Sequence, residues 1–509
     1  MTAPTRRQTI GRAALSAAVL STGCVGPAYH VPRAPAPVAA AYKELGAGWK
    51  HATPSDAIPR GRWWEMFHEP ELDALEQRLN IDNQTIAQAV ESYLVARAQI
   101  RAARAGYFPT VTADPSVMWF RSSGITAGGS AAATTVGSPA GSAIAGRHVV
   151  YLAPLDASWA PDLFGRVRYA VHQKQYAAQV SAADLESTRL AAQVALAQAY
   201  FQLHAQDTLE DVLAATVKAD QAIADLTRLQ YTAGLATEIA LTQADLTLEA
   251  ARVQVTSAGL LRAQLEHAIA TLIGAPATDF AVPRRGLVAR PPAIPTGAPS
   301  QLLERRPDVA AAERQMASAN AVIGLGYTAY YPLVTLTGSA GFESSALDAL
   351  FDWPSRIWAL GASVSETVFD GGLRRANIDQ AVAAYHASVA GYRQTVLAAF
   401  QQVEDALAGT RIVAQEVGQQ RRVVELARKA LELETARYEK GLDPYIDLAL
   451  QQTALLAAQQ TLVGLEASQM VVAVALVEAL GGGWDRSELP TPAQVSQPAP
   501  PGAYDLGHP

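Results

Sequence analysis

Two aspartates placed four residues apart form the part of this chain whose spacing most suggests chemistry. Asp443 and Asp447 flank the tripeptide Pro444-Tyr445-Ile446. A helix that begins near Pro444 would bring both carboxylates to one face, where they could attract or bind cations. An ordinary helix start explains the same residues, because the positive end of the helix dipole favours acidic side chains. Both interpretations remain open from the residues alone.

No other spacing predicts catalysis or metal binding. The nine histidines are scattered, and a single cysteine excludes a disulfide framework or a cysteine-based zinc site within one chain. No motif pairs a nucleophilic side chain with a general base. The segment Gly324–Ala329 superficially matches a dinucleotide fingerprint, but it follows a helical pattern and precedes a strand, the reverse of what that motif requires. We therefore expect no enzyme, no metal and no cofactor.

The single cysteine, Cys24, lies at the end of a predicted export signal. Arg6, Arg7 and Arg12 precede the short apolar run 13–20, and small residues follow it. A basic start, a brief apolar segment and small residues are typical of a secretory signal. The run is far shorter than the ~20 residues that a transmembrane helix needs.

The residues before Cys24 resemble the lipobox of bacterial lipoproteins, in which the cysteine becomes the acylated first residue. In that resemblance Val25 favours delivery to the outer membrane, and the acyl chains would include palmitate. A buried or incidental cysteine is the alternative. The pair Arg6-Arg7 also leaves open whether export uses the general or the twin-arginine route.

Composition favours long packed helices over a bulky globular core. Half of the residues are apolar, aromatic residues are few and alanine is abundant. Small apolar side chains allow helices to approach closely. The formal net charge of -7 gives no electrostatic reason to expect nucleic acid as a partner.

The chain contains one internal repeat. Tyr231-Thr232-Ala233-Gly234-Leu235 recurs 207 residues later as Tyr438-Glu439-Lys440-Gly441-Leu442, and the same offset relates Gly274 to Gly481. Each copy interrupts a long stretch of helix-forming sequence, so it is predicted to be the turn of a long helical hairpin. A spacing this large indicates a duplicated unit, well above the periods of solenoids.

The helical stretches are unusually long. Residues 166–233 contain no Gly or Pro, and at ~1.5 Å per residue such a helix would reach ~100 Å. Steps of three and four predict a coiled-coil seam with one polar member, made of Leu209, Val212, Thr216, Ala219, Ile223 and Leu226. A second long helix is predicted from about 373 to the turn at Gly441, with its apolar face at Leu426, Ala430 and Leu433. Residues 71–105 are predicted to form two shorter helices that divide near 80–83.

Alternating apolar residues predict short strands around 111–119 and 149–159, and because the second half repeats the order of the first, two more strands are predicted at 333–343 and 357–369. The predicted organisation is a signal peptide at 1–23 and a lipidated extended segment at 24–60, followed by repeats at 61–275 and 299–484. A Pro-rich linker at 276–298 joins the repeats, and a disordered tail occupies 485–509.

Several motifs together resemble the TolC-like outer-membrane factors, in their OprM/NodT-type efflux lipoprotein branch. The segment Pro299–Val309, followed by Ala312-Glu313, closely resembles a signature of this family. Other matches follow the family order across the whole mature chain: Cys24-x-Gly26-Pro27-x-Tyr29-x-x-Pro32, Trp63-Trp64-x-x-Phe67, Asp162-Leu163-Phe164-Gly165-Arg166, Phe369-Asp370-Gly371-Gly372 and both Tyr-x-x-Gly-Leu turns.

The resemblance implies an α+β membrane protein. Three chains would each contribute four strands to one β-barrel, and their helical hairpins would continue as a coiled-coil tunnel through the periplasm. Closure across subunits suits a membrane, because an open four-stranded sheet would leave unpaired edges in lipid. The implied partners are two further copies, outer-membrane lipid, a periplasmic adaptor and an inner-membrane pump of the RND type.

The resemblance also implies roles for the two turns. Residues of the second turn would close the periplasmic aperture, namely Asp443, Tyr445, Asp447 and Leu450. Threefold symmetry would make each aspartate a ring of three carboxylates, while Leu450 would make the constriction more hydrophobic. Both turns would dock the adaptor, through Gly234, Leu235, Thr237, Glu238, Gly441 and Leu442. The two glycines are expected in a backbone conformation closed to other residues.

These observations predict the outer-membrane exit duct of a tripartite efflux system that exports drugs or other small molecules. One alternative is an outer-membrane channel for protein or peptide secretion. The other is a periplasm-spanning structural lipoprotein without a pore.

Overall fold

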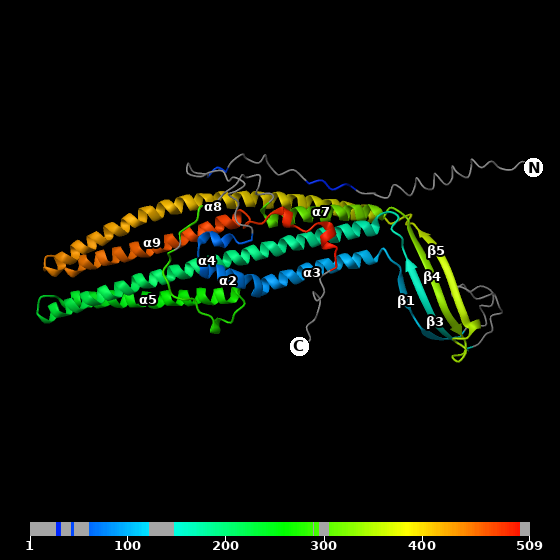
Figure 1. Ribbon diagram of the computed structural model, residues 1–509, viewed down its shortest axis with the longest axis horizontal. Helices are drawn as coiled ribbons and strands as arrows, with labels where there is room; N and C mark the ends of the chain where they lie inside the picture. Colours follow the sequence, from blue (N-terminus) through cyan, green and yellow to red (C-terminus); the bar gives the residue numbers. More distant parts are fainter. Residues whose placement is uncertain are drawn as a thin grey trace, which may run out of the picture.

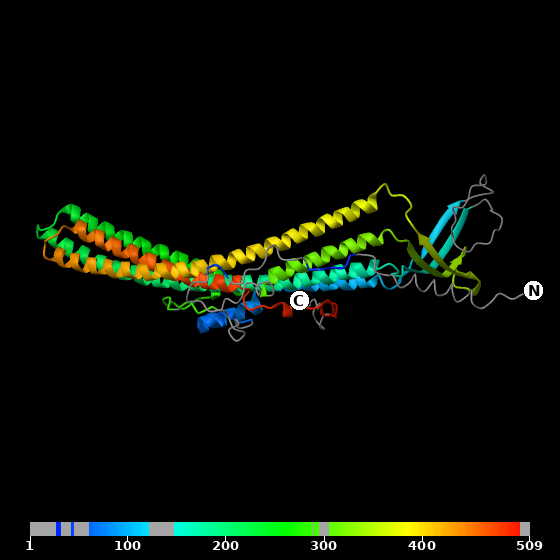
Figure 2. The same cartoon turned by 90° about the horizontal axis from the view of Figure 1, so that it is seen from above.

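The computed structural model describes residues 27–31, 42–44, 61–121, 147–288, 290–294 and 305–498. It is a long rod with a β-sheet at one end and the turns of two helical hairpins at the other (Figures 1 and 2). The predicted signal peptide, Cys24, the loop 122–146 and residues 499–509 lie outside the described residues.

The internal duplication predicted from the sequence is confirmed. Helices α4 (Arg166–Thr232) and α8 (Leu373–Glu439) both have 67 residues. Their return helices α5 (Glu238–Leu272) and α9 (Tyr445–Ala479) both have 35. Helices α3 (Gln84–Ala105) and α7 (Pro307–Thr328), which precede the strands of each repeat, both have 22. The bounds of α4, α5, α8 and α9 are all related by the offset of 207 found in the sequence.

Local sequence explains where these helices begin and end. Gly165 and Gly372, with φ of 84° and 92°, precede α4 and α8 and adopt a left-handed conformation that a side chain would oppose. The short helix α2 (Pro70–Asp82) is separated from α3 at Asn83, as predicted. The Asn83 side chain accepts a hydrogen bond from Ile86 N at 2.9 Å and so caps α3.

The sheet holds four rows of antiparallel strands. Strands β1 (Thr110–Ala113) and β2 (Ser116–Arg121) both pair with β3 (Arg147–Trp159), which pairs with β4 (Leu333–Ser344) and then β5 (Arg356–Ser365). Because β1 and β2 lie end to end along β3, they act as one interrupted row. The short helices are η2 (Trp63–Phe67), η3 (Ala277–Asp279), η5 (Trp353–Ser355), η6 (Arg486–Glu488) and α10 (Pro492–Val495).

The strand register gives the sheet an apolar face and a more polar face. Ala157 lies opposite Gly338, which lies opposite Leu360, so these residues share one side. That side continues with Val111, Leu155, Trp159, Leu336, Trp358 and Val364. The other side carries Thr112, Asp156, Ser158, Thr337, Ser339 and Ser363. Trp358 and Leu360 are 75% and 81% exposed, so the apolar face is uncovered in the single chain.

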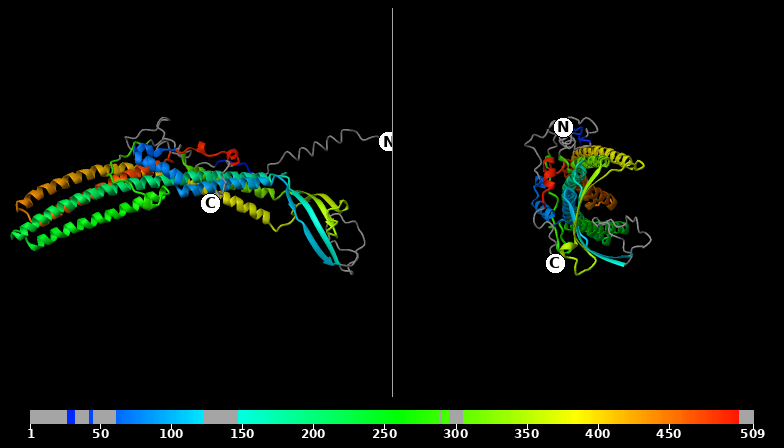
Figure 3. Two further views of the ribbon diagram at one scale, coloured as in Figure 1. Left: turned by 60° about the horizontal axis from the view of Figure 1, so that its bottom comes forward. Right: turned by 90° about the vertical axis from the view of Figure 1, so that its right-hand side faces the viewer.

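The helices form an open arc when viewed along the rod (Figure 3). Near the sheet, contacts join α3 to α4, α4 to α7 and α7 to α8. Towards the turns they join α5 to α4, α4 to α9 and α9 to α8. Helix α8 is therefore one edge of the arc, and α3 and α5 form the other. The main core lies at mid-length, where α2, η2 and α4 of the first repeat meet the second repeat.

The coiled-coil seam predicted on α4 is half-buried at five of its six positions, and Ile223 and Leu226 pack against the core near the turns, but the fully buried positions lie mostly one residue further along. The buried positions in this stretch are Glu210, Leu213, Asp220, Ala224 and Thr227, whereas the predicted Ala219 is exposed. Helix α4 also contacts the second hairpin, so its buried face includes polar residues with partners there: Asp220 pairs with Gln452 of α9, and Thr227 with Tyr438 of α8. Leu426 and Leu433, predicted as the apolar face of α8, are 71% and 56% exposed for a related reason: they lie on the edge of the arc.

Residues 485–498, the described part of the C-terminal tail, pack against α3 and α4, contrary to the prediction of disorder from residue 485. Val495 is fully buried against Ile100 of α3 and Val171 of α4. Gln179 donates to Pro490 O at 2.8 Å, and Arg97 donates to Gln497 O at 2.7 Å. Proline prevents a long helix here, but side chains of α3 and α4 donate hydrogen bonds to the carbonyl groups of the extended backbone. The segment therefore connects the second repeat to helices of the first.

Helix α9 alone, among the described helices, is long and apolar enough to cross a membrane by length and composition. It packs along α8 and α4, as the core helix of a bundle does.

Candidate functional site

The turns of the two hairpins have the same backbone design. Gly234 and Gly441 have φ of 75° and 71°, which confirms the predicted left-handed conformation. The next residues close the helix ends, since Leu235 N donates to Gln230 O at 2.8 Å and Leu442 N donates to Arg437 O at 3.0 Å. Both leucines are largely exposed, at 81% and 64%. In the first turn Thr237 caps α5 by accepting from Ala240 N, and Glu238 is exposed beside it.

Asp443 is held by an arginine of its own hairpin. Arg437 donates to Asp443 through Nη2 at 2.8 Å and also through Nε. The hydrogen bond from Arg437 lowers the pKa of the Asp443 carboxyl. Partial desolvation and the nearby carboxylates of Asp443 and Asp447 raise the pKa of Glu434. Asp443 therefore belongs to a local ion-pair cluster with Arg437.

Asp447 lies in the first turn of α9 and is exposed. Among the described residues it makes no salt bridge, so its carboxylate is available to a neighbouring molecule or ion. Leu450 is 59% exposed on the same helix. Tyr445 differs from both: it is 4% exposed and packs against Tyr438, with ring centroids 6.0 Å apart. Of the four residues predicted for the aperture, Asp447 and Leu450 thus present free side chains, whereas Tyr445 supports the turn from inside.

Polar contacts tie the second hairpin to the first near the turns. The Tyr438 hydroxyl lies 2.8 Å from Thr227 Oγ1 and donates to Gln230 Oε1 at 2.9 Å. Further from the turn, Gln452 Nε2 donates to Asp220 Oδ1 at 2.9 Å. The sequence marked Tyr438 as part of the repeated turn but gave no sign of its partners. Its counterpart in the first repeat, Tyr231, is 41% exposed. Only Tyr438 is therefore buried between the two hairpins of this chain.

Asp220 makes the contact between the hairpins sensitive to pH. It is 4% exposed, and burial raises its pKa from 3.8 to about 6. The folded state therefore binds a proton more tightly than the unfolded state does. This contribution to stability is present below the unfolded pKa and is lost as pH rises through about 6.

We expect Asp220→Asn to stabilise the protein at pH 8 by on the order of 2 kcal/mol and to have little effect at pH 4. The amide keeps the oxygen that accepts from Gln452 but has no charge to bury. Thermal unfolding of wild type and variant at the two pH values measures the difference. An equal effect at both pH values would contradict the assignment of the charge as the cause.

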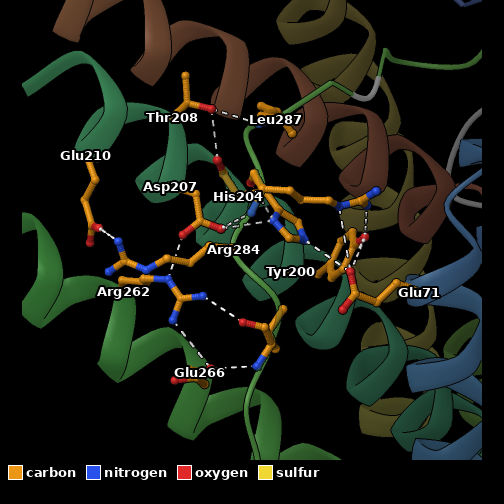
Figure 4. Close-up of polar contacts among 12 residues, drawn as sticks. Glu71, Tyr200, His204, Asp207, Thr208, Glu210, Arg262, Glu266, Arg284 and Leu287 are labelled. Carbon is orange, nitrogen blue, oxygen red and sulfur yellow. Dashed lines mark hydrogen bonds and ion pairs between the residues drawn. The ribbon is translucent and has the colours of Figure 1, made fainter. Parts of the chain in front are cut away.

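A buried polar cluster holds the linker between the repeats, and we call it the linker clasp (Figure 4). Arg262 of α5 donates to Asp207 Oδ1 of α4 at 2.6 Å and to Val282 O at 2.8 Å. Glu266 accepts from Val282 N at 2.6 Å. Further along the linker, Thr208 Oγ1 accepts from Leu287 N at 2.8 Å. Helix side chains thus replace the backbone partners that the linker lacks.

The linker clasp also reaches the start of α2. Arg285 pairs with Glu69 and contacts the Tyr200 hydroxyl, and Arg285 O lies 3.0 Å from His204 Nδ1. Burial and the nearby Glu69 carboxylate raise the pKa of Tyr200. The sequence predicted a linker at 276–298 but not its attachment, because the partners come from three distant segments.

The linker clasp contains a histidine–aspartate pair, with Nδ1 of His204 3.3 Å from Oδ2 of Asp207. Such a pair could orient a general base. His204 is 1% exposed, however, and its other nitrogen lies 3.8 Å from Glu71 Oε2 and faces no described nucleophile. The pair is buried and bonded to the linker, so it acts as part of the brace. The described residues also hold no group of metal ligands.

The glycines at 324 and 326 are packing residues. Both lie inside α7, and a side chain on Gly324 would collide with the ring of Tyr169 on α4. The segment that superficially matched a dinucleotide fingerprint therefore serves close helix packing.

Comparisons with known proteins agree with this architecture. A family model described as "Outer membrane efflux protein" matches residues 75–275 and 298–482, one match for each repeat. A probable efflux pump outer membrane protein, TtgC of Pseudomonas putida, is 31% identical over 496 residues, which cover 96% of this chain and 98% of the relative. The outer membrane protein OprJ of Pseudomonas aeruginosa is 30% identical, with 94% of this chain and 97% of the relative covered.

Solved structures resemble the fold over the same extent. The outer-membrane channel OprN superposes with a TM-score of 0.78 at 28% identity, covering 90% of this chain and 99% of the other. The Campylobacter jejuni channel CmeC superposes with a TM-score of 0.81 at 22% identity, covering 91% and 96%. The two family matches cover more than half of the chain, and the relatives align along nearly all of their length. The chain therefore belongs to the family of outer membrane efflux proteins.

Proposed function

We propose that this protein is the outer-membrane exit duct of a tripartite efflux system, and that three copies form one barrel and one periplasmic tunnel. The observation that carries the proposal is the open arc of elements, with an apolar sheet face at one end and paired hairpins at the other. Relatives named as efflux pump outer membrane proteins support it. The substrates would be drugs or other small molecules, supplied by an inner-membrane pump of the RND type through a periplasmic adaptor.

The sheet supports closure by further copies. Its edge rows, β1 with β2 on one side and β5 on the other, have no second strand partner among the described residues. Unpaired strand edges are very costly in lipid, and a closed ring removes them. The apolar face would meet lipid, while Asp156 and the Ser and Thr residues of the other face would line a wet interior. Three chains would supply twelve rows of strands.

The duplication supports the same arrangement for the helices. Within the chain, α9 of the second hairpin packs against α4 of the first. The corresponding packing, α5 of the first hairpin against α8 of a second hairpin, is not made to a comparable extent among the described residues. Another copy would supply it and would also cover the exposed Tyr231, whose repeat partner Tyr438 is buried.

Exposed apolar residues lie along α5 and α8, the two edge helices, at similar distances from the hairpin turns. On α5 they recur every seven residues at Ile239, Leu246, Val253 and Leu260, each at least 63% exposed, and we call them the α5 stripe. On α8 they are Leu426 and Leu433. At ~1.5 Å per residue, Leu246 and Leu433 both lie ~10 Å from their turns, and Val253 and Leu426 both lie ~20 Å away. Heptad spacing is typical of a seam between helices.

The gate of the duct would be the second turn. Around a threefold axis, Asp447 would form a ring of carboxylates and Leu450 a hydrophobic ring, with Asp443 bound to Arg437 behind them. The ties from Tyr438 and Gln452 to the first hairpin would hold the closed state. Leu235 and Leu442, exposed at the tips with Gly234, Thr237, Glu238 and Gly441 around them, would dock the adaptor.

The purified protein in planar bilayers tests the duct. We expect a conducting, cation-preferring pore, and we expect Asp447→Ala to reduce the cation preference, measured as a smaller reversal potential in a salt gradient. Glu238→Ala removes the acid of the first turn and serves as the matched control, with a smaller effect. A protein that forms trimers but never conducts, even as Asp447→Ala, would instead be a structural lipoprotein.

A channel for secreted proteins or peptides remains the second candidate within transport. The purification partner distinguishes the two: an adaptor with a proton-driven pump supports small-molecule efflux, and an adaptor with a peptide-exporting ATPase supports secretion. Lipid anchoring at Cys24 is part of the proposal for either channel.

A further inference from the structure

A groove between α7 and α8 lies beside the first described residues of the chain. Its volume is about 450 Å³, and it is lined by Pro27, Asn320, Ile323, Tyr327, Val382, Tyr385 and His386. Most of these side chains are apolar or aromatic. The residues ascend α7 from 320 to 327, towards the end of that helix at Thr328, and α8 borders them with residues 386 to 382 in the same direction. One end of the groove therefore opens towards the sheet.

The N-terminal segment is fixed along α7 in a known direction. Asn320 Nδ2 donates to Pro27 O at 3.2 Å. Seven residues further from the sheet, the Tyr29 hydroxyl donates to Glu313 Oε1 at 2.6 Å. Glu313 is 3% exposed and also pairs with Arg314 and Arg486, so this anchor point is rigid. Followed backwards from Tyr29 to Pro27, the chain approaches the sheet.

Simple lengths then relate Cys24 to the groove. Pro27 is the third residue after Cys24, and three steps of at most ~3.5 Å each span about 10 Å in all. Asn320 lies eight residues before the end of α7, or ~12 Å at 1.5 Å per residue. Chain length therefore limits Cys24 to about 10 Å from Pro27, which lines the groove, so an acyl chain on Cys24 can reach it.

We propose that the groove receives a fatty-acyl chain of Cys24, which runs between α7 and α8 towards the membrane. The inference rests on the lipid anchor of the proposed function and adds where one chain of that anchor lies. Apolar walls beside an acylated terminus would otherwise be exposed to water, and covering them with methylene groups is favourable. The docked chain would join the lipid anchor to the two helices that border the groove.

Photo-crosslinking in the full-length, membrane-extracted protein tests the proposal. Tyr327, which is 39% exposed, is replaced with benzoylphenylalanine, an aromatic residue of related shape. His386→benzoylphenylalanine, at an exposed position on the opposite wall, is the second variant if the first fails to fold. Leu397→benzoylphenylalanine lies further along α8, outside the groove, and is the negative control. Leu360→benzoylphenylalanine, on the apolar sheet face, is the positive control for labelling free lipid.

The expected product joins residue 327 or 386 to the acyl chain of the N-terminal Cys24 peptide, identified by mass spectrometry, with no such product from residue 397. Adducts only with free phospholipid, with a second copy, or with peptide atoms of residues 24–26 would overturn the proposal. So would the absence of adducts in the groove variants while residue 360 labels lipid. The mass of the intact protein separates failure of the lipid anchor from failure of the groove proposal. An unmodified Cys24 overturns the lipid anchor itself. An acylated Cys24 without the crosslinked product overturns only the binding of the acyl chain in the groove.

Discussion

Placing glutamate at Leu246 and Val253 is expected to abolish assembly of the protein into trimers. Both residues belong to the α5 stripe and are 68% exposed in the single chain, so the substitutions leave its own core intact. In the trimer they would bury two uncompensated charges per interface, each at a cost of several kcal/mol. We expect crosslinking or native electrophoresis to give monomers, with conductance and efflux lost together.

Leu246→Met with Val253→Ile is the matched control, because it keeps both side chains apolar and should leave the trimer unchanged. Two results would contradict the assignment. If the glutamate variant forms normal trimers and conducts but no longer binds the adaptor, the α5 stripe is a docking surface for the adaptor. If it forms trimers and binds the adaptor, the stripe has no role at any interface.

Replacing Arg262 with glutamine is expected to be the most destabilising single change among those considered. Arg262 is 7% exposed and neutralises Asp207, which is 4% exposed, while also binding Val282 O. Removal of Arg262 leaves the buried Asp207 carboxylate without its countercharge. This lowers the free energy of unfolding by about 3–5 kcal/mol. The linker would also lose backbone hydrogen bonds. We expect a fall of many degrees in the apparent Tm and rapid proteolysis between the two repeats.

Arg252→Gln gives the control on the same helix. Arg252 is exposed and pairs with Glu249 at 2.6 Å. Exposed ion pairs of this kind contribute about 0–1 kcal/mol to the free energy of unfolding. Similar losses for the two variants would show that the linker clasp is no more important than a surface ion pair. Cleavage of the Arg262 variant outside residues 276–298 would argue against a clasp that protects the linker.

Much of the fold could be predicted because it depends on local sequence. Helix continuity between residues 166 and 232 follows from the absence of Gly and Pro, and the turns follow from glycines that accept a left-handed backbone. The repeat could be recognised because the same turn motif recurs 207 residues later in the sequence, and the structure gives helices of equal length in both copies. Alternation of side chains located the strands to within a few residues, except that the last strand ends at Ser365, earlier than the predicted 369.

The candidate gate was predictable in outline only. Asp447 and Leu450 lie exposed at the second turn, where the sequence indicated them. The capture of Asp443 by Arg437 and the burial of Tyr445 were not predictable, because the first depends on how the turn folds back and the second on the neighbouring hairpin. The linker clasp escaped prediction for the same reason, since its residues come from α2, α4, α5 and the linker.

The sequence by itself determined the duplicated plan of strands, long helices and glycine turns, because hydrogen bonding within a helix and the φ angle of a glycine depend on nearby residues. The tertiary structure decided which face of each helix is buried. On α4 the buried face extends one residue beyond the predicted seam and includes Asp220 and Thr227, because Gln452 and Tyr438 of the other hairpin form hydrogen bonds with them. Residues 490–497 of the Pro-rich tail pack against the helices because α3 and α4 offer partners for their backbone. Burial is a property of the neighbours that a residue meets, and those neighbours lie hundreds of residues away.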